Sequence, residues 1–273
     1  MSRFRVHIFL TVVSIILYLI LIREQSQSDS TIAQLIAEPI NQITLQQTQQ
    51  YTINKDEHGH WYFHSPIYAP AHPERIALLL QFLSQPIEYV FAVNEVHDIS
   101  EFGFKDNSLI LQLNHQHAIT FGQRSPFDSQ RYIQYQGALY VVKDTIYSLL
   151  DSHYVNLIDN RLLPYHAKIQ SIKLPRYREK KIISEETVTL HHITETDNLI
   201  TLWRSAVAHQ VSIGQPPFQP DNAASVIVTF DNQKTVTLRI KKYQDHTVIF
   251  NPELNLRYRL PADFFQYTLP TEK

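Results

Sequence analysis

Histidine is the residue type that could most readily supply chemistry in this chain, which contains fourteen histidines and no cysteine. Two pairs are separated by a single residue: His58 with His60, and His115 with His117. Side chains at positions i and i+2 of a strand point to the same face, so either pair could bind one zinc ion. Asp56 or Glu57 could supply a third ligand. Both pairs fall at expected turns, however, where histidine is an ordinary surface residue, and we therefore expect no metal ion and no cofactor.

Other kinds of catalytic chemistry find little support in the sequence. The absence of cysteine excludes a thiolate nucleophile or metal ligand. No G-x-S-x-G elbow is present, and the five glycines are scattered, so no glycine-rich phosphate loop exists. Adjacent acids such as Asp56 and Glu57 need not face each other in space. We expect that the protein is not an enzyme.

A second class of candidate comprises residues that could form an interaction surface. Trp61 and Phe63 could belong to an aromatic platform or docking strip, although alternating aromatic residues more simply fill a core. The stretch 168–181 is rich in basic residues and is either a solvated linker or a patch for anionic headgroups or an acidic partner. The candidate surface residues are Trp61, Phe63, Arg176, Arg178, Lys180 and Lys181.

The candidate residues all lie after an apolar run at residues 6–22, which follows Arg3 and Arg5 and must position the rest of the chain, called the body below. As a helix it would span about 26 Å, close to the roughly 30 Å of a bilayer core. The positive-inside rule keeps residues 1–5 in the cytoplasm and places the rest beyond the membrane, although Arg23 weakens the asymmetry. We expect a single-pass inner-membrane protein with a periplasmic body. A cleaved signal peptide, cut near Ser26 to Ser30, is the alternative.

The exported part carries a charge that disfavours one class of partner. After Arg23, 21 basic residues face 26 acidic ones, which gives a formal net charge of −5. Nucleic-acid binding needs the opposite balance. We therefore expect no nucleic-acid partner.

Hydrophobic patterning predicts the organisation of the body. Residues 23–38 read as a tether with a short helix around Thr31 to Ala37, and order is expected to begin near Pro39. Pro73 suits the first position of a helix. Residues 109–113 and 118–121 alternate apolar and polar positions around a turn at 114–117, as half-buried antiparallel strands do. We predict a first α+β domain over 39–175.

The second half repeats the first in outline. After a predicted linker at 176–186, a helix is expected from Asp197 to Ala206, with apolar spacing similar to that of the first helix. Residues 226–240 then match 109–122 as two alternating strands around a polar turn. The predicted fold is α+β: an N-terminal transmembrane helix followed by two related small domains, the second over 187–270. Each domain would be a bent antiparallel sheet with one packed helix.

Several segments together resemble a bacterial family known only as a domain of unknown function. The matching segments are Pro39 to Leu45, Gly59-His60-Trp61, the helix Pro73 to Gln85, Ile99 to Phe104, Gly122, and the strands at Arg131 to Ile133 and Leu139 to Val142. Phe102 and Phe104 stand where the family more often has Tyr and Leu. Family members are membrane-anchored and often encoded beside gliding-motility-type ABC transporter genes. The resemblance covers about residues 39–175, carries no known catalytic residue, and implies an accessory role near a membrane complex.

These observations lead to two hypotheses of function. The first is a non-catalytic, membrane-anchored periplasmic interaction module that serves as an accessory or scaffold subunit of an envelope complex, such as an ABC transporter. Its partners would be envelope or inner-membrane proteins. The alternative is a binding module for cell-wall glycan or another envelope ligand. Exposed aromatic residues lining a cleft would favour the ligand, and a flat apolar strip or exposed edge strand would favour a protein partner.

Overall fold

The computed structural model describes residues 30–92, 98–126, 129–164, 167–178, 181–189, 195–216, 218 and 223–264. The predicted anchor at residues 6–22 and the cytoplasmic stretch 1–5 lie outside these ranges. Among the helices in the described ranges, none is both long and apolar enough to cross a membrane. Order begins earlier than expected, because Ile32 and Ile36 of the short helix α2 (Ile32–Ile36) are buried.

The described chain divides into two compact units, and the division falls between His153 and Tyr154. The first unit contains residues 30–66 and 73–153, and the second contains 67–72 together with the chain from 154 onward. The predicted boundary near residue 175 is therefore wrong, because it lies inside the strand at Ile169–Arg178 and well after the division that the structure shows. Residues 154–175 already belong to the second unit.

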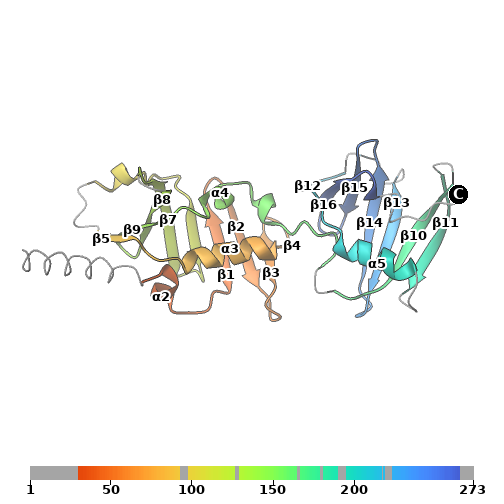
Figure 1. The fold of residues 1–273 in the computed structure, drawn as a ribbon, viewed down its shortest axis with the longest axis horizontal. Helices are drawn as coiled ribbons and strands as arrows, with labels where there is room; N and C mark the ends of the chain where they lie inside the picture. The colour runs from red at the N-terminus through yellow and green to blue at the C-terminus, as the bar shows by residue number, and fades with distance from the viewer. Residues whose placement is uncertain are drawn as a thin grey trace, which may run out of the picture. The chain divides into compact units, whose positions relative to one another are not determined.

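The first unit is built on an antiparallel sheet whose strands run in the order β3-β2-β1-β6-β7-β8-β9-β5 (Figure 1). The elements that follow α2 in the chain are β1 (Gln42–Gln46), β2 (Gln50–Lys55), β3 (Trp61–Ser65), β4 (Ala69–Pro70), α3 (Pro73–Leu83), β5 (Tyr89–Ala92), the 3-10 turn η2 (Ile99–Phe102), β6 (Ile110–Leu113), β7 (His117–Arg124), β8 (Gln130–Tyr135), β9 (Ala138–Lys143) and α4 (Tyr147–Leu150). Of these, the two-residue strand β4 lies within residues 67–72 and so belongs to the second unit.

Alternating apolar residues explain why these strands pair as they do. Ile43 and Leu45 of β1 are fully buried and stand opposite Leu113 and Leu111 of β6, so the two strands share one core face. Helix α3 begins at Pro73, as predicted, and buries a stripe at helical spacing. The buried residues of that stripe are Ile76, Leu79, Phe82 and Leu83.

The second unit contains a seven-stranded antiparallel sheet in the order β11-β10-β13-β14-β15-β16-β12. Its elements are the 3-10 turn η3 (Tyr154–Leu157), β10 (Ile169–Arg178), β11 (Lys181–Thr189), α5 (Glu195–Ser205), β12 (Gln210–Ile213), β13 (Ala224–Phe230), β14 (Thr235–Lys242), β15 (His246–Asn251) and β16 (Leu256–Pro261). Trp203 of α5 is fully buried, as expected of a core anchor, and its ring meets that of Phe264 edge to face at 5.5 Å.

The strand orders of the two sheets show an internal repeat. Seven strands of the first sheet, β2-β1-β6-β7-β8-β9-β5, correspond one by one to the seven strands of the second. In both units a helix of 11 residues precedes the strand at the far edge, α3 before β5 and α5 before β12. The α+β class is confirmed, and the shared strand order agrees with the predicted repeat. The first unit differs by its additional strand β3.

The predicted linker at 176–186 is part of a β-hairpin. Residues up to Arg178 continue β10, and β11 returns from Lys181, with a register shift between Arg176 and Tyr177. Pro175, which suggested a linker, is tolerated because β13 pairs with β10 only as far as Lys173. Beyond that residue the described strands pair with β10 on one side only, and proline is tolerated in a strand that has an unpaired edge.

Candidate functional site

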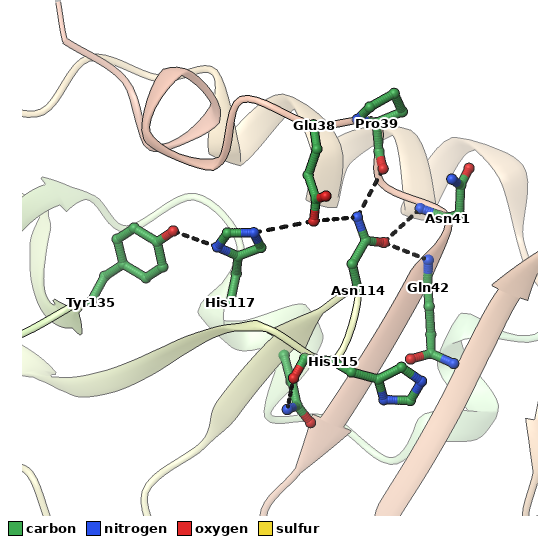
Figure 2. A network of polar contacts seen from close by, with 9 residues as sticks. Glu38, Pro39, Asn41, Gln42, Asn114, His115, His117 and Tyr135 are labelled. Atoms are coloured by element: carbon green, nitrogen blue, oxygen red, sulfur yellow. Dashed lines mark hydrogen bonds and ion pairs between the residues drawn. The ribbon is translucent and has the colours of Figure 1, made fainter.

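A dense polar network of the first unit surrounds the turn between β6 and β7 (Figure 2). Asn114 and His115 both adopt positive φ angles, 48° and 61°, and the N–H group of Gln116 donates to the carbonyl of Leu113. Two successive positive φ angles are typical of the tight hairpin turn that favours asparagine at its first position. The predicted turn at 114–117 is confirmed, and it points the Asn114 side chain at the segment that enters β1.

The side chain of Asn114 uses its whole hydrogen-bonding capacity on that segment. Its Oδ1 accepts from the backbone N–H groups of Asn41 at 2.9 Å and Gln42 at 3.2 Å. Its Nδ2 donates to the carbonyl of Pro39 at 2.8 Å and to the Glu38 carboxylate at 2.9 Å. The backbone adds a bond from the Asn114 N–H group to the Gln42 carbonyl, at 3.0 Å. One turn residue therefore fastens the entering chain from residue 38 to residue 42.

His117 extends this network from the carboxylate into the core. Its Nε2 lies 3.1 Å from Oε1 of Glu38, and its Nδ1 lies 2.7 Å from the Tyr135 hydroxyl. A carboxylate can only accept a hydrogen bond, so Nε2 carries a proton; in the neutral tautomer Nδ1 then accepts from the tyrosine. This neutral tautomer satisfies all three groups in one direction, from Tyr135 through His117 to Glu38.

The same geometry decides what chemistry the three groups can perform. Tyr135 is 1% exposed, so no substrate reaches its hydroxyl. Burial raises the pKa of that hydroxyl, and the nearby Tyr140 and Glu38 raise it further, so it stays protonated as a donor. The His117 side chain is 13% exposed and has a partner on each ring nitrogen. The arrangement is suited to holding a segment in place.

Helix α2 positions Glu38 for this network. Thr31 caps the helix by accepting from the N–H group of Gln34, and the Gln34 side chain accepts from the N–H group of Thr31 in return. Ala37 ends the helix with a φ of 56°, which turns the chain toward β1 and leaves Glu38 facing the β6–β7 turn (Figure 2).

The first candidate metal pair, His58 and His60, lies at the β2–β3 turn. Asp56 organises this turn by accepting from the backbone N–H groups of His60 at 2.7 Å and His58 at 3.0 Å. Desolvation alone would raise the pKa of Asp56, but these N–H groups hold it below its ordinary value. The His58 side chain is 71% exposed and lies near Glu57, at 3.6 Å. The carboxylate that we considered as a ligand is thus committed to the turn.

The second candidate pair does not converge. His115 is exposed at the tip of the turn, while the ring of His117 is turned toward Glu38 and Tyr135 (Figure 2). The alternation rule fails here because His115 has a positive φ and belongs to the turn, not to a strand. Within the described ranges, no three His, Asp or Glu side chains are grouped as a metal site would require.

The structure separates the two aromatic candidates for an interaction surface. Phe63 is fully buried and lies 6.0 Å from the ring of Tyr51, so its assignment to a surface was wrong. Strand alternation explains this, because the side chain points into the core with Ile53 opposite it on β2. Trp61 is half-buried near the strand start, with the Lys55 ammonium 5.8 Å from its ring.

The basic candidates lie at the end of the β10–β11 hairpin. Arg176 and Arg178 belong to β10, and Lys181 begins β11 opposite Arg178. Lys180 and the side chains of the other three lie outside what the structure describes, so an interaction surface here stays a prediction.

Sequence reasoning missed the residues that matter most to the network. Glu38 and Tyr135 are 79 and 18 residues away from His117, and no local pattern connects them. Asn114 carried a usable signal, because asparagine before a polar residue between two alternating strands is typical of a turn with positive φ. That signal predicts the turn but not the segment to which the side chain binds.

Comparison with known families gives a match over the middle of the chain. The family model described as domain of unknown function (DUF4340) matches residues 61–205, which is more than half of the sequence. The chain belongs to the DUF4340 family. The match begins in β3 and ends with α5, so the DUF4340 model includes parts of both repeats, among them the β10–β11 hairpin of the second. No curated protein and no solved structure matches the chain.

Proposed function

We propose that the protein is a non-catalytic, membrane-anchored periplasmic module that serves as an accessory or scaffold subunit of an envelope complex, such as an ABC transporter. The observation that carries this proposal is the network around Asn114. It is the densest set of polar side-chain contacts described in the first repeat, and its groups are engaged in fastening the chain that arrives from the predicted anchor.

The position of this network suits a body held from its N-terminal side. The chain that follows the predicted anchor at residues 6–22 contacts the first unit at Ser30 and Thr31, and it then enters β1 through residues 38–42, where the network holds it. Hydrogen bonds that cross from one strand entrance to a neighbouring turn resist peeling of that strand. A body released into solution has no comparable need for a reinforced entrance.

Sidedness and anchoring can be tested with single cysteines, because the chain has none of its own. Lys234 is exposed in the β13–β14 turn, and Lys234→Cys offers a labelling site in full-length protein. We expect a membrane-impermeant maleimide to label it in intact spheroplasts while the protein stays in the carbonate-washed membrane fraction. Labelling only after lysis, or loss of the protein from the membranes, would contradict the proposal.

The scaffold role needs a separate experiment. Crosslinking in native membranes, followed by purification of the full-length protein, should recover a defined set of inner-membrane or envelope proteins. The Asn114→Gly variant, expressed to the same level, should recover less of the same set because its entry segment is loosened. Recovery of cell-wall glycan without any membrane protein would contradict the scaffold role and support ligand binding.

A further inference from the structure

Strand β5 exposes three consecutive large apolar side chains. Tyr89 is 53% exposed, Val90 is 52% exposed and Phe91 is 41% exposed. Successive side chains of a strand point to opposite faces, so the described residues leave both faces of β5 partly exposed. The strand is also the last in its sheet, and within the described part of the chain no strand pairs with its outer edge. An uncovered apolar edge strand marks an interaction site or an aggregation hazard.

The equivalent strand of the second repeat shows that the position itself does not require this exposure. Strand β12 occupies the same place in its sheet, beside the last strand of the meander. Only its first residue, Gln210, is exposed, and Val211, Ser212 and Ile213 are half-buried. The apolar edge is therefore a property of the first repeat alone.

The chain from the predicted anchor enters the first unit beside β5. The N–H group of Ile87 donates to the carbonyl of Ser30 at 2.9 Å, and Thr31 forms a bridge with Pro86. Tyr89 follows two residues later, about 7 Å along the strand. Seven residues, 23–29, separate the apolar run from Ser30, and they span at most about 25 Å when extended. The tether therefore keeps β5 within reach of the bilayer surface.

We propose that β5 binds the lipid surface of the membrane that holds the anchor, with Tyr89, Val90 and Phe91 at the level of the headgroups. This inference rests on the proposed membrane anchoring. Aromatic and aliphatic side chains favour the boundary between headgroups and acyl chains. The backbone groups on the outer edge, with which no described strand pairs, would lack hydrogen-bond partners in the hydrocarbon core, so β5 cannot insert there. At the border of the core these groups can bond to water and headgroups. Tethering makes even a weak contact effective, because the local lipid concentration is high.

The test uses full-length protein in liposomes with an environment-sensitive dye on a single cysteine. Val90→Cys reports on β5, and Tyr89→Cys serves as a second reporter on the opposite face of the strand. The matched control is Val207→Cys, since Val207 is a valine of nearly equal exposure, 48%, in the second unit. Circular dichroism confirms that each variant is folded, and flotation confirms that it is bound to liposomes.

We expect the dye at positions 89 and 90 to emit at shorter wavelength in liposomes than in detergent-free buffer, and to lose more emission to a headgroup-attached quencher than the dye at 207. If both variants float but the dye at position 90 behaves like the dye at position 207, the proposed contact of β5 with lipid is wrong and the proposed anchoring stands. Protein that fails to float would overturn both. Efficient disulfide formation between two copies of the undyed Val90→Cys variant would replace lipid by a second copy as the occupant.

Discussion

The two repeats share one strand order but differ at the turn where each is fastened to its entering chain. In the first, Asn114 at the β6–β7 turn bonds to Glu38, Pro39, Asn41 and Gln42, and His117 adds a further contact to Glu38. In the second, the N–H group of Asp231 at the β13–β14 turn donates to the Lys168 carbonyl at 2.9 Å. The Gln233 side chain there donates to that of Gln170 at 3.1 Å.

The contrast shows that two units with one strand order can differ in hydrogen bonding and exposure at equivalent positions. The backbone bond from the turn to the entering strand is common to both repeats, from Asn114 to Gln42 and from Asp231 to Lys168. Among the described residues, the side-chain reinforcement is more extensive in the first repeat, which lies nearer in sequence to the predicted anchor. The exposed apolar strand β5 also belongs to the first repeat, while β12 is less exposed.

The largest effect should come from the helices, where the repeats are alike. Trp203→Ala in α5 should lower the free energy of unfolding by about 3–5 kcal/mol, because it removes a fully buried aromatic side chain. Leu83→Ala in α3 should cost about 2–5 kcal/mol. Urea unfolding followed by circular dichroism measures both. Leu202→Ala, 41% exposed on the same helix as Trp203, should change stability by no more than about 0.5 kcal/mol; a comparable loss there would contradict the packing described.

The next effect should separate the repeats. Asn114→Gly keeps a residue that tolerates the φ of 48° but removes four side-chain hydrogen bonds, and should cost about 2–3 kcal/mol. Asn232→Gly, at the corresponding turn, removes one described bond, to the Lys234 N–H group, and should cost about 1 kcal/mol or less. Equal losses in urea unfolding would remove the distinction between the two entrances.

A smaller effect tests the direction of the His117 network. Tyr135→Phe keeps the buried ring and removes the hydroxyl that donates to Nδ1 of His117, at a cost of about 1 kcal/mol. Nitrogen NMR of the His117 ring should show the proton on Nε2 in the wild-type protein at neutral pH. A proton on Nδ1 would reverse the assigned direction of the chain.

The smallest effects concern two turn carboxylates, one in each unit. Although desolvation acts to raise it, the pKa of Asp56 lies below its ordinary value because backbone N–H groups donate to the carboxylate. The pKa of Asp245 is also lowered, and the main cause is its hydrogen bond with the side chain of His246. His246→Ala should therefore return the Asp245 pKa toward its ordinary value, whereas His60→Ala should leave much of the Asp56 depression in place. Carboxyl-carbon NMR titration measures both values.

The sign of the pH dependence follows from these depressed values. Each carboxylate favours the folded state above its unfolded pKa, and that contribution is lost as the pH falls through the lower folded pKa. We therefore expect His246→Ala to reduce the stability difference between neutral and acidic pH slightly. An increase of that difference would contradict the assigned cause.

Local patterns predicted much of the fold. Pro73 located the start of α3, and the alternation around 109–121 located the β6–β7 hairpin. The same alternation at 226–240 revealed the repeat. These features succeed because one face of each element is buried and the periodicity records it. The hairpin β10–β11 was missed because Pro175 and the surrounding charges resemble a linker. Only the strand pairing shows that Pro175 lies beyond the last described residue of β10 that pairs with β13.

The network could not be predicted, because its parts meet only through tertiary structure. His117 was considered with His115 as a metal ligand, since spacing is the only relation that a sequence displays. Its actual partners are Glu38 and Tyr135, which the pairing of β1 with β6 and of β7 with β8 brings together. Predicting them would have required the sheet order first.

Amide hydrogen exchange of the two entering segments tests the central claim most directly. Mass spectrometry of full-length protein in liposomes would follow peptides covering residues 40–43 and 168–171. We predict slower exchange in the first peptide than in the second after correction for intrinsic rates, and loss of that difference in Asn114→Gly. Equal exchange in the wild-type protein would contradict the account, because the first entrance would then be no more firmly held than the second.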